Sequence, residues 1–168
     1  LIAFLGSSFG NFEYKHGLEF LHKINSSMNN DDLFLIGLDL VKDKAVLERA
    51  YDDPQGVTAR FNLNVLSRIN SELDGDFNID KFAHHSFYNE NQNRIEIYIR
   101  SLENQIVNIP KAEMVLQIKR GELIHTENSH KYTIPKIKEI FSATGFRIRD
   151  MWFDKKQHFC LALLSKNN

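Results

Sequence analysis

The chain has 168 residues, of which 42% are hydrophobic and 26% are charged, so it is long enough to bury one sizeable core. Its formal net charge of -1 leaves no positive surplus for nucleic acid or an anionic membrane surface. The apolar runs are strand-sized, well short of the ~20 residues that span a bilayer, and the single cysteine, Cys160, excludes an intrachain disulfide. We therefore expect a cytoplasmic protein with no nucleic-acid and no membrane partner.

The opening of the chain predicts a strand, a helix and a second strand. Residues 1–5 and 33–40 are apolar without alternation, as in buried parallel strands. Between them Leu18, Leu21 and Ile24 recur at helical spacing. The loops after both strands of such a unit lie at one sheet edge, where open α/β folds bind ligands. Because the chain begins directly on a buried type of strand, we expect sequence to precede it.

The middle of the chain changes character. A short helix is expected at 44–50, and Asp53-Pro54 predicts the start of another, with an apolar stripe that includes Phe61 and Val65. From residue 83 onward alternation and turn residues predict an antiparallel meander, with strands at 83–89, 94–100, 105–109 and 114–119.

The end of the chain returns to α/β style. Thr133 is expected to cap a helix that Gly145 ends, and residues 146–153 and 159–164 predict a hairpin. Cys160 lies in the second of these apolar runs, where a buried and inert thiol is expected. The pattern as a whole predicts an α/β fold with a long insertion.

Local motifs alone predict no reaction. The loop 6–11 follows a strand and precedes a helix, but it has neither the G-x-G-x-x-G spacing nor a P-loop lysine, and a turn whose Ser or Asn caps the helix is the alternative. The Asn11 amide, both donor and acceptor, suits a zwitterionic amino-acid head group. The histidines show no metal-ligand spacing, and no nucleophile elbow accompanies Ser129. In an extended segment His125, Glu127 and Ser129 share one face.

Seven strings along the chain carry a resemblance to a known family. They are L-G-S-S-F-G-N-F at 5–12, G-L-D-L-V-K-D at 37–43, A-Y-D-D at 50–53, G-V-T-A-R-F-N at 56–62, N-V-L at 64–66, R-I-E-I at 94–97, and G-E at 121–122 with T-E-N-S at 126–129. In this order and spacing they strongly resemble the histidine-specific N-alpha-methyltransferases of ergothioneine biosynthesis. These enzymes use S-adenosyl-L-methionine.

The resemblance implies a fold and a division of the chain. It implies the C-terminal half of a Rossmann-like class I methyltransferase sheet with an inserted α+β substrate-binding domain. Residues 1–43 would belong to the methyltransferase core, residues 44–132 to the insertion, and residues 133–168 to the core again.

The resemblance also implies site residues for a small-molecule amino-acid substrate. Asn11 would hold the α-amino and carboxylate groups, Tyr51 would help to fix the carboxylate, and Glu127 with Ser129 would recognise an imidazole ring. The remaining implied contacts are Thr58, Phe61 and Ile97 to the substrate, and Gly6 with Ser7 to the cofactor. No residue is expected to act as a catalytic acid or base, because methyl transfer needs a deprotonated amine held in line. The family's product is trimethylated.

Two departures from the family keep alternatives open. Ile97 stands where the family has methionine, so another aromatic amino acid is an alternative substrate, although Glu127 favours a nitrogen-bearing ring. The family's glycine-rich cofactor loop is not in this chain. We therefore expect the chain alone to be inactive and to self-associate through the exposed edge of its first strand. The alternative is a non-catalytic amino-acid-binding module.

Overall fold

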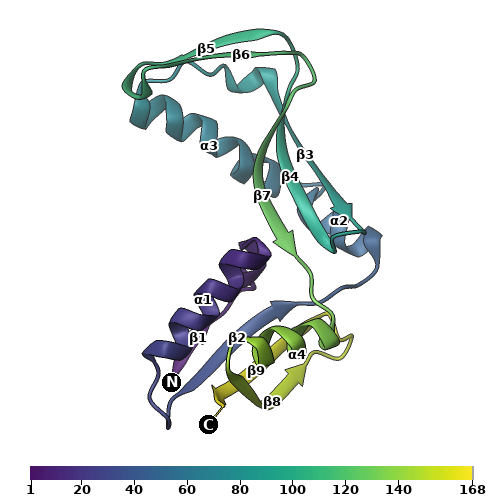
Figure 1. Ribbon diagram of the computed structural model, residues 1–168. Coiled ribbons are helices and arrows are strands. Elements are labelled where there is room, and N and C mark those ends of the chain that lie inside the picture. Colours follow the sequence, from purple (N-terminus) through teal and green to yellow (C-terminus); the bar gives the residue numbers. More distant parts are fainter. Residues whose placement is uncertain (168) are drawn as a thin grey trace. The chain divides into compact units, whose positions relative to one another are not determined.

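The structure, a computed structural model, describes residues 1–167 (Figure 1). The chain packs as two compact units, each described by itself. Unit 1 comprises residues 1–43, 89–94 and the chain from residue 128 onward, and unit 2 comprises residues 44–88 and 95–127. Within the described residues, none of the helices has the length and apolar content needed to cross a membrane.

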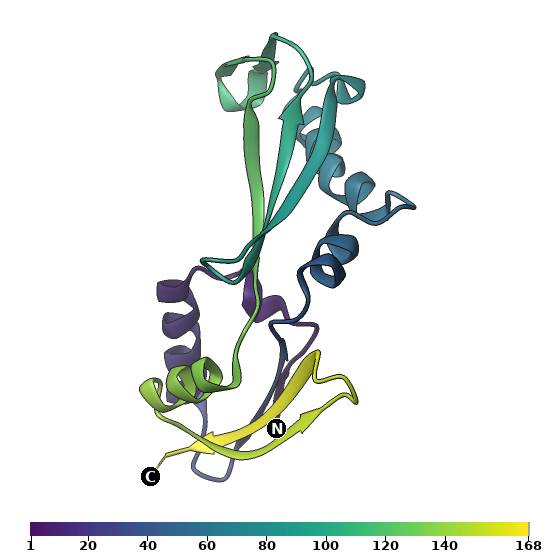
Figure 2. The same cartoon turned by 90° about the vertical axis from the view of Figure 1, so that its right-hand side faces the viewer.

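Unit 1 is a four-stranded sheet covered by two helices. The strands run in the order β1 (Ile2–Phe4), β2 (Leu33–Asp39), β9 (Phe159–Lys166) and β8 (Phe146–Phe153). The pair β1 and β2 is parallel, and the other pairs are antiparallel. Helices α1 (Tyr14–Ser27) and α4 (Ile134–Ala143) cover the same face of this sheet (Figures 1 and 2). The predicted strand–helix–strand unit and terminal hairpin are confirmed.

The core of unit 1 lies between this sheet and its helices. Leu21 is fully buried, with Leu18 and Ile24 packed against the same cluster, as the spacing on α1 predicts. Cys160 is also fully buried, and burial raises the pKa of its thiol to about 11. Thr133 caps α4 by accepting a hydrogen bond from the Lys136 amide, as expected.

Unit 2 combines two α-helices with five strands, three of which continue into unit 1. The helices are α2 (Lys44–Tyr51) and α3 (Val57–Leu73). A three-stranded sheet has the order β3 (Phe82–Asn89), β4 (Arg94–Ser101) and β7 (Leu123–His130), and β5 (Gln105–Ile109) pairs antiparallel with β6 (Met114–Ile118).

The predicted meander is wrong in its pairing, although its strands exist. Strand β4 has β3 and β7 as neighbours, while β5 and β6 form a separate hairpin. The amide of Ser101 donates to the Glu122 carbonyl at 3.0 Å, and the Gly121 amide donates to the Ser101 carbonyl at 2.8 Å. These bonds bring the chain back to the end of β4, so β7 occupies the position that a meander would give to β5.

The predicted start of α3 is also wrong, and its predicted buried face is right only in part, because Leu66 of the expected stripe is buried. The helix begins at Val57, and the Asp53 carboxylate reaches forward to accept from the amides of Val57 at 2.9 Å and Thr58 at 2.8 Å. Phe61 is 76% exposed and Val65 is 41% exposed, so neither belongs to the buried stripe. The buried face instead includes polar Asn62, which a purely apolar pattern passes over.

Candidate functional site

The loop after β1 is tied to the end of β2. Gly6 and Ser7 both have positive φ, 77° and 60°, which turns the chain sharply at the end of β1. The Ser7 Oγ accepts a hydrogen bond from the Asp39 amide at 2.9 Å. The alternative reading, in which Ser or Asn of this loop caps the next helix, is wrong for α1, because Glu13 is its N-cap and makes no side-chain cap bond.

The same loop packs backbone to backbone against the end of β7. A Cβ on Gly10 would lie 2.8 Å from the carbonyl oxygen of His130, too close for any side chain. Asn11 follows Gly10, and Ser129 precedes His130. The structure therefore brings together two segments to which the sequence assigns contacts with the amino-acid substrate.

A network of charged groups lies at the carboxyl end of β2. The Lys131 Nζ donates to the Ser129 Oγ at 2.8 Å and pairs with Asp39 Oδ2 at 3.0 Å. Lys42 pairs with the other oxygen of Asp39. The side chain of Lys131 is fully buried, whereas those of Asp39 and Lys42 are 18% and 13% exposed. A buried cation needs such partners, because an isolated charge is costly away from water.

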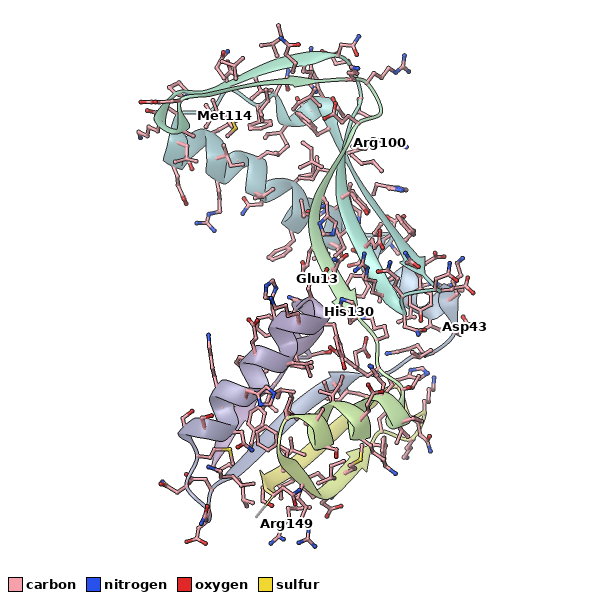
Figure 3. All side chains as sticks on the ribbon, in the orientation of Figure 1. Glu13, Asp43, Arg100, Met114, His130 and Arg149 are labelled. Atoms are coloured by element: carbon pink, nitrogen blue, oxygen red, sulfur yellow. The ribbon has the colours of Figure 1, made fainter. Side chains whose placement is uncertain are left out.

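Further polar contacts fix the start of α1. The Glu13 carboxylate accepts from Asn128 Nδ2 at 2.7 Å and from Arg94 Nη1 at 3.3 Å. Figure 3 labels Glu13, the N-cap of α1, and His130, the last residue of β7. A cavity of about 270 Å³ opens beside them, lined by residues that include Phe9 and Tyr132, and it contains none of the predicted site residues.

In unit 2 the structure brings Tyr51 and Ile97 together. Tyr51 packs against the buried cluster that contains Ile97. The Tyr51 carbonyl accepts from His84 Nε2 at 2.8 Å and from the Ser86 hydroxyl at 3.2 Å. Because Nε2 of His84 donates, its Nδ1 can accept from Asn62 Nδ2, 3.0 Å away. Sequence reasoning missed His84 and Asn62, since nothing local marks them as supports of Tyr51.

The other predicted residues of unit 2 are placed by α3 and β7. Thr58 lies in the first turn of α3, held through its amide by Asp53, and Phe61 lies one turn further along. Glu127 is half-buried on β7. Of the predicted residues, unit 1 contains Gly6, Ser7, Asn11 and Ser129, and unit 2 contains Tyr51, Thr58, Phe61, Ile97 and Glu127.

Comparison with known proteins supplies the remaining observation. The family model described as "Histidine-specific methyltransferase, SAM-dependent" matches residues 1–166. The chain belongs to this family. It is 39% identical over 166 residues to the histidine N-alpha-methyltransferase of Mycobacterium tuberculosis, covering 99% of this chain and 52% of that protein. It is 28% identical to the L-tryptophan methyltransferase of Psilocybe serbica, covering 99% and 47%. The chain thus spans about half the length of these relatives.

Solved structures agree with the α/β methyltransferase fold of the family. An S-adenosylmethionine-dependent methyltransferase from Clostridium acetobutylicum matches with a TM-score of 0.51 at 9% identity, covering 99% of this chain and 58% of that one. The CcbJ methyltransferase from Streptomyces caelestis matches with a TM-score of 0.51 at 5% identity, covering 99% and 56%. At such identities the likeness concerns the fold alone.

Proposed function

We propose that the protein transfers methyl groups from S-adenosyl-L-methionine to the α-amino group of L-histidine, up to the trimethylated product. The observation that carries this proposal is the close backbone approach of Gly10 to His130 in a chain of the histidine-specific family. That approach sets the loop of Asn11 against the strand end that carries Ser129. A head-group residue and a ring residue thereby lie on neighbouring segments.

In the proposal each predicted residue has one task. Asn11 binds the α-amino and carboxylate groups, and Tyr51 helps to fix the carboxylate. Glu127 and Ser129 hydrogen-bond the ring nitrogens. The walls of the pocket come from Thr58, Phe61 and Ile97. The positions of Glu127 and Ser129 on one strand, two residues apart, support their joint action on a planar ring.

In the proposed reaction these residues orient the α-amine of the substrate toward the methyl group. S-adenosyl-L-methionine supplies an electrophilic methyl group on a sulfonium, and Gly6 and Ser7, in their left-handed turn, suit the close backbone approach needed beside it. Asn11 and Tyr51 hold the neutral α-amine so that its lone pair points along one line. Most of the rate enhancement of the methyl transfer is proposed to come from this positioning of the two reactants. The residues need neither remove nor supply a proton in the transfer step.

The choice of ring is proposed to rest on Glu127. An imidazole N–H can donate a hydrogen bond to this carboxylate, and a hydrocarbon ring has no such donor. In the full-length gene product, Glu127→Ala should lower kcat/KM for histidine by about tenfold, the size of one lost charge-assisted hydrogen bond, and change that for tryptophan far less. Equal losses for both substrates would contradict this role and favour another aromatic amino acid as the natural substrate.

For a polypeptide of these 168 residues by itself we propose no measurable methyl transfer. We propose that such a polypeptide lacks the family's glycine-rich loop and therefore does not bind S-adenosyl-L-methionine. Because β1 has a single neighbour among the described strands, we also propose self-association at that edge. Calorimetry that finds micromolar affinity for S-adenosyl-L-methionine would contradict the lack of cofactor binding. Light scattering that finds a monomer at high concentration would contradict the self-association. We propose that the protein acts in the cytoplasm.

A further inference from the structure

Strand β6 of unit 2 has a neighbour on one side only. It pairs with β5 in a two-stranded sheet, and no other described strand joins this hairpin (Figure 1). From Met114 to Ile118 the strand contains no proline and no charged residue. Proteins usually protect such an edge with charges, prolines or bulges, because unpaired backbone groups are a template for another chain. We propose that β6 pairs with β6 of a second copy of this chain, in a continuous four-stranded antiparallel sheet.

The hydrogen bonds of β5 show which backbone groups of β6 face the open edge. The Asn108 amide donates to Asp76 Oδ1 at 2.7 Å, and the Asn108 carbonyl accepts from the Asp76 amide at 3.1 Å. Both backbone groups of Asn108 therefore point away from β6. In an antiparallel pair, two opposite residues either exchange both bonds or both point outward. Val115, which lies opposite Asn108, and Gln117, two residues further on, therefore direct their amides and carbonyls to the open edge.

The open edge of β6 is short and has defined ends. Within residues 1–167, the structure gives Val115 and Gln117 no backbone hydrogen bond beyond the hairpin. At one end the Lys119 amide donates to the Glu122 carboxylate at 2.9 Å, so the edge is occupied there. At the other end Glu113 leaves the extended conformation, with a φ of 50°. The edge therefore fits a partner strand of the same short length.

One register of two β6 strands matches both the backbone and the charges. With a two-fold axis at Leu116, Val115 lies opposite Gln117 of the second copy, and each such pair exchanges two backbone hydrogen bonds. This register also sets Glu113 of each copy opposite Lys119 of the other. Both side chains are exposed, and neither has an ion-pair partner among the described residues. A parallel pairing would instead set like charges opposite each other, which is destabilising.

Apolar side chains on both faces of the hairpin gain cover from this pairing. Val115 is 63% exposed and Ile106 is 67% exposed, and the strand register places them on one face. Leu116, on the other face, packs against the core of unit 2 but is only half-buried. At the axis it meets Leu116 of the second copy. Because so few residues take part, the interface is small, and we expect a dissociation constant on the order of tens of micromolar.

Sedimentation of the full-length gene product over a concentration series tests the proposal. The wild type should show a reversible equilibrium between monomer and dimer. Glu113→Lys sets two lysines against each other at both ends of the interface, and Lys119→Glu does the same with two glutamates. Each change should raise the dissociation constant about tenfold. The variant that carries both changes has opposite charges again and should dimerise as the wild type does.

Lys155→Glu is the matched control, because it makes the same change of charge as Lys119→Glu in the loop between β8 and β9 of unit 1. Its dissociation constant should equal that of the wild type, and thermal unfolding should show that each charge variant is folded. A wild type that stays monomeric throughout the series would overturn the proposal. A double variant that dimerises no better than the single ones would overturn it as well.

Val115→Pro distinguishes the edge of β6 from other edges. It removes an outward amide without removing a hydrogen bond inside the hairpin, as prolines on edge strands do. The dimer should therefore weaken while the protein remains folded. A dimer of unchanged strength in a folded Val115→Pro variant would place the contact at another edge, such as that of β1, and would contradict the proposal.

Discussion

At the scale of single residues, the structure adds polar partners to residues that the sequence assigns to the site. Asn11, Tyr51 and Ser129 could be singled out from short strings, because the resemblance is carried by those strings. Lys131 and His84 could not, because each has a partner distant in sequence: Lys131 pairs with Asp39, and His84 donates to the carbonyl of Tyr51. Polar residues that meet only in the folded chain leave no local pattern.

His84→Phe tests the support of Tyr51. The change removes the donor to the Tyr51 carbonyl, so the end of α2 should loosen, with a loss of about 1 kcal/mol in the free energy of unfolding. The KM for histidine should rise, as measured by steady-state methyl transfer with the full-length protein. The neighbouring His85→Phe is the matched control, since His85 contacts the rings of Phe87 and Tyr98 and should tolerate the change. An unchanged KM in His84→Phe would show that Tyr51 does not need this bond.

At the scale of elements, the strands and helices of unit 1 follow local patterns and were predictable. Continuous apolar runs predicted β1 and β2, and the spacing of Leu18, Leu21 and Ile24 predicted α1. The order of the strands in unit 2 was not predictable in the same way, because it depends on backbone bonds between Ser101 and the turn at 121–122. The start of α3 was misplaced because Asp53 caps it from a distance of several residues.

The Asp53 cap gives α3 a defined dependence on pH. The amides of Thr58 and Val57 lower the pKa of the Asp53 carboxyl from 3.8 to about 2. Because the folded pKa is depressed, its stabilisation is present above about pH 4 and is lost as pH falls toward about 2. Asp53→Asn should lower the thermal midpoint at pH 7, and the gap to wild type should close in that acid range.

Asp52→Asn is the matched control for this prediction, because Asp52 is the adjacent exposed carboxylate and accepts no bond from the start of α3. Its unfolding midpoint should follow that of the wild type at each pH. A constant gap between Asp53→Asn and wild type from pH 7 to pH 2 would show that the charge of Asp53 does not stabilise the helix.

The contact of the β1 loop with β7 gives a second prediction for elements. In Gly10→Ala the new methyl group would lie 2.8 Å from the His130 carbonyl oxygen, so the backbone must shift, at a cost of about 1–3 kcal/mol in stability. Methylation of histidine should fall more than stability alone explains, because Asn11 moves with the loop. Gly17→Ala is the control, since its methyl group meets the side chains of Phe9 at 3.1 Å and Phe12 at 3.7 Å and no backbone atom of β7. Full activity in a stable Gly10→Ala variant would refute the role of this contact.

At the scale of the whole molecule, family and fold are established while the reaction is proposed. The family model matches nearly all of the chain, and the chain covers about half of the Mycobacterium tuberculosis and Psilocybe serbica relatives. Those relatives include a histidine and a tryptophan methyltransferase, so membership by itself does not fix the ring. In the proposed function Glu127 decides it, because a carboxylate accepts a hydrogen bond from an imidazole N–H.

The most direct measurement is methyl transfer by the full-length gene product to a panel of histidine, tryptophan, tyrosine and phenylalanine, followed by mass spectrometry. The account predicts addition of methyl groups to the α-amine of histidine, with kcat/KM for tryptophan at least about tenfold lower, the difference expected for one lost charge-assisted hydrogen bond to the ring. Equal or better methylation of tryptophan, or no transfer to any of the four, would contradict it.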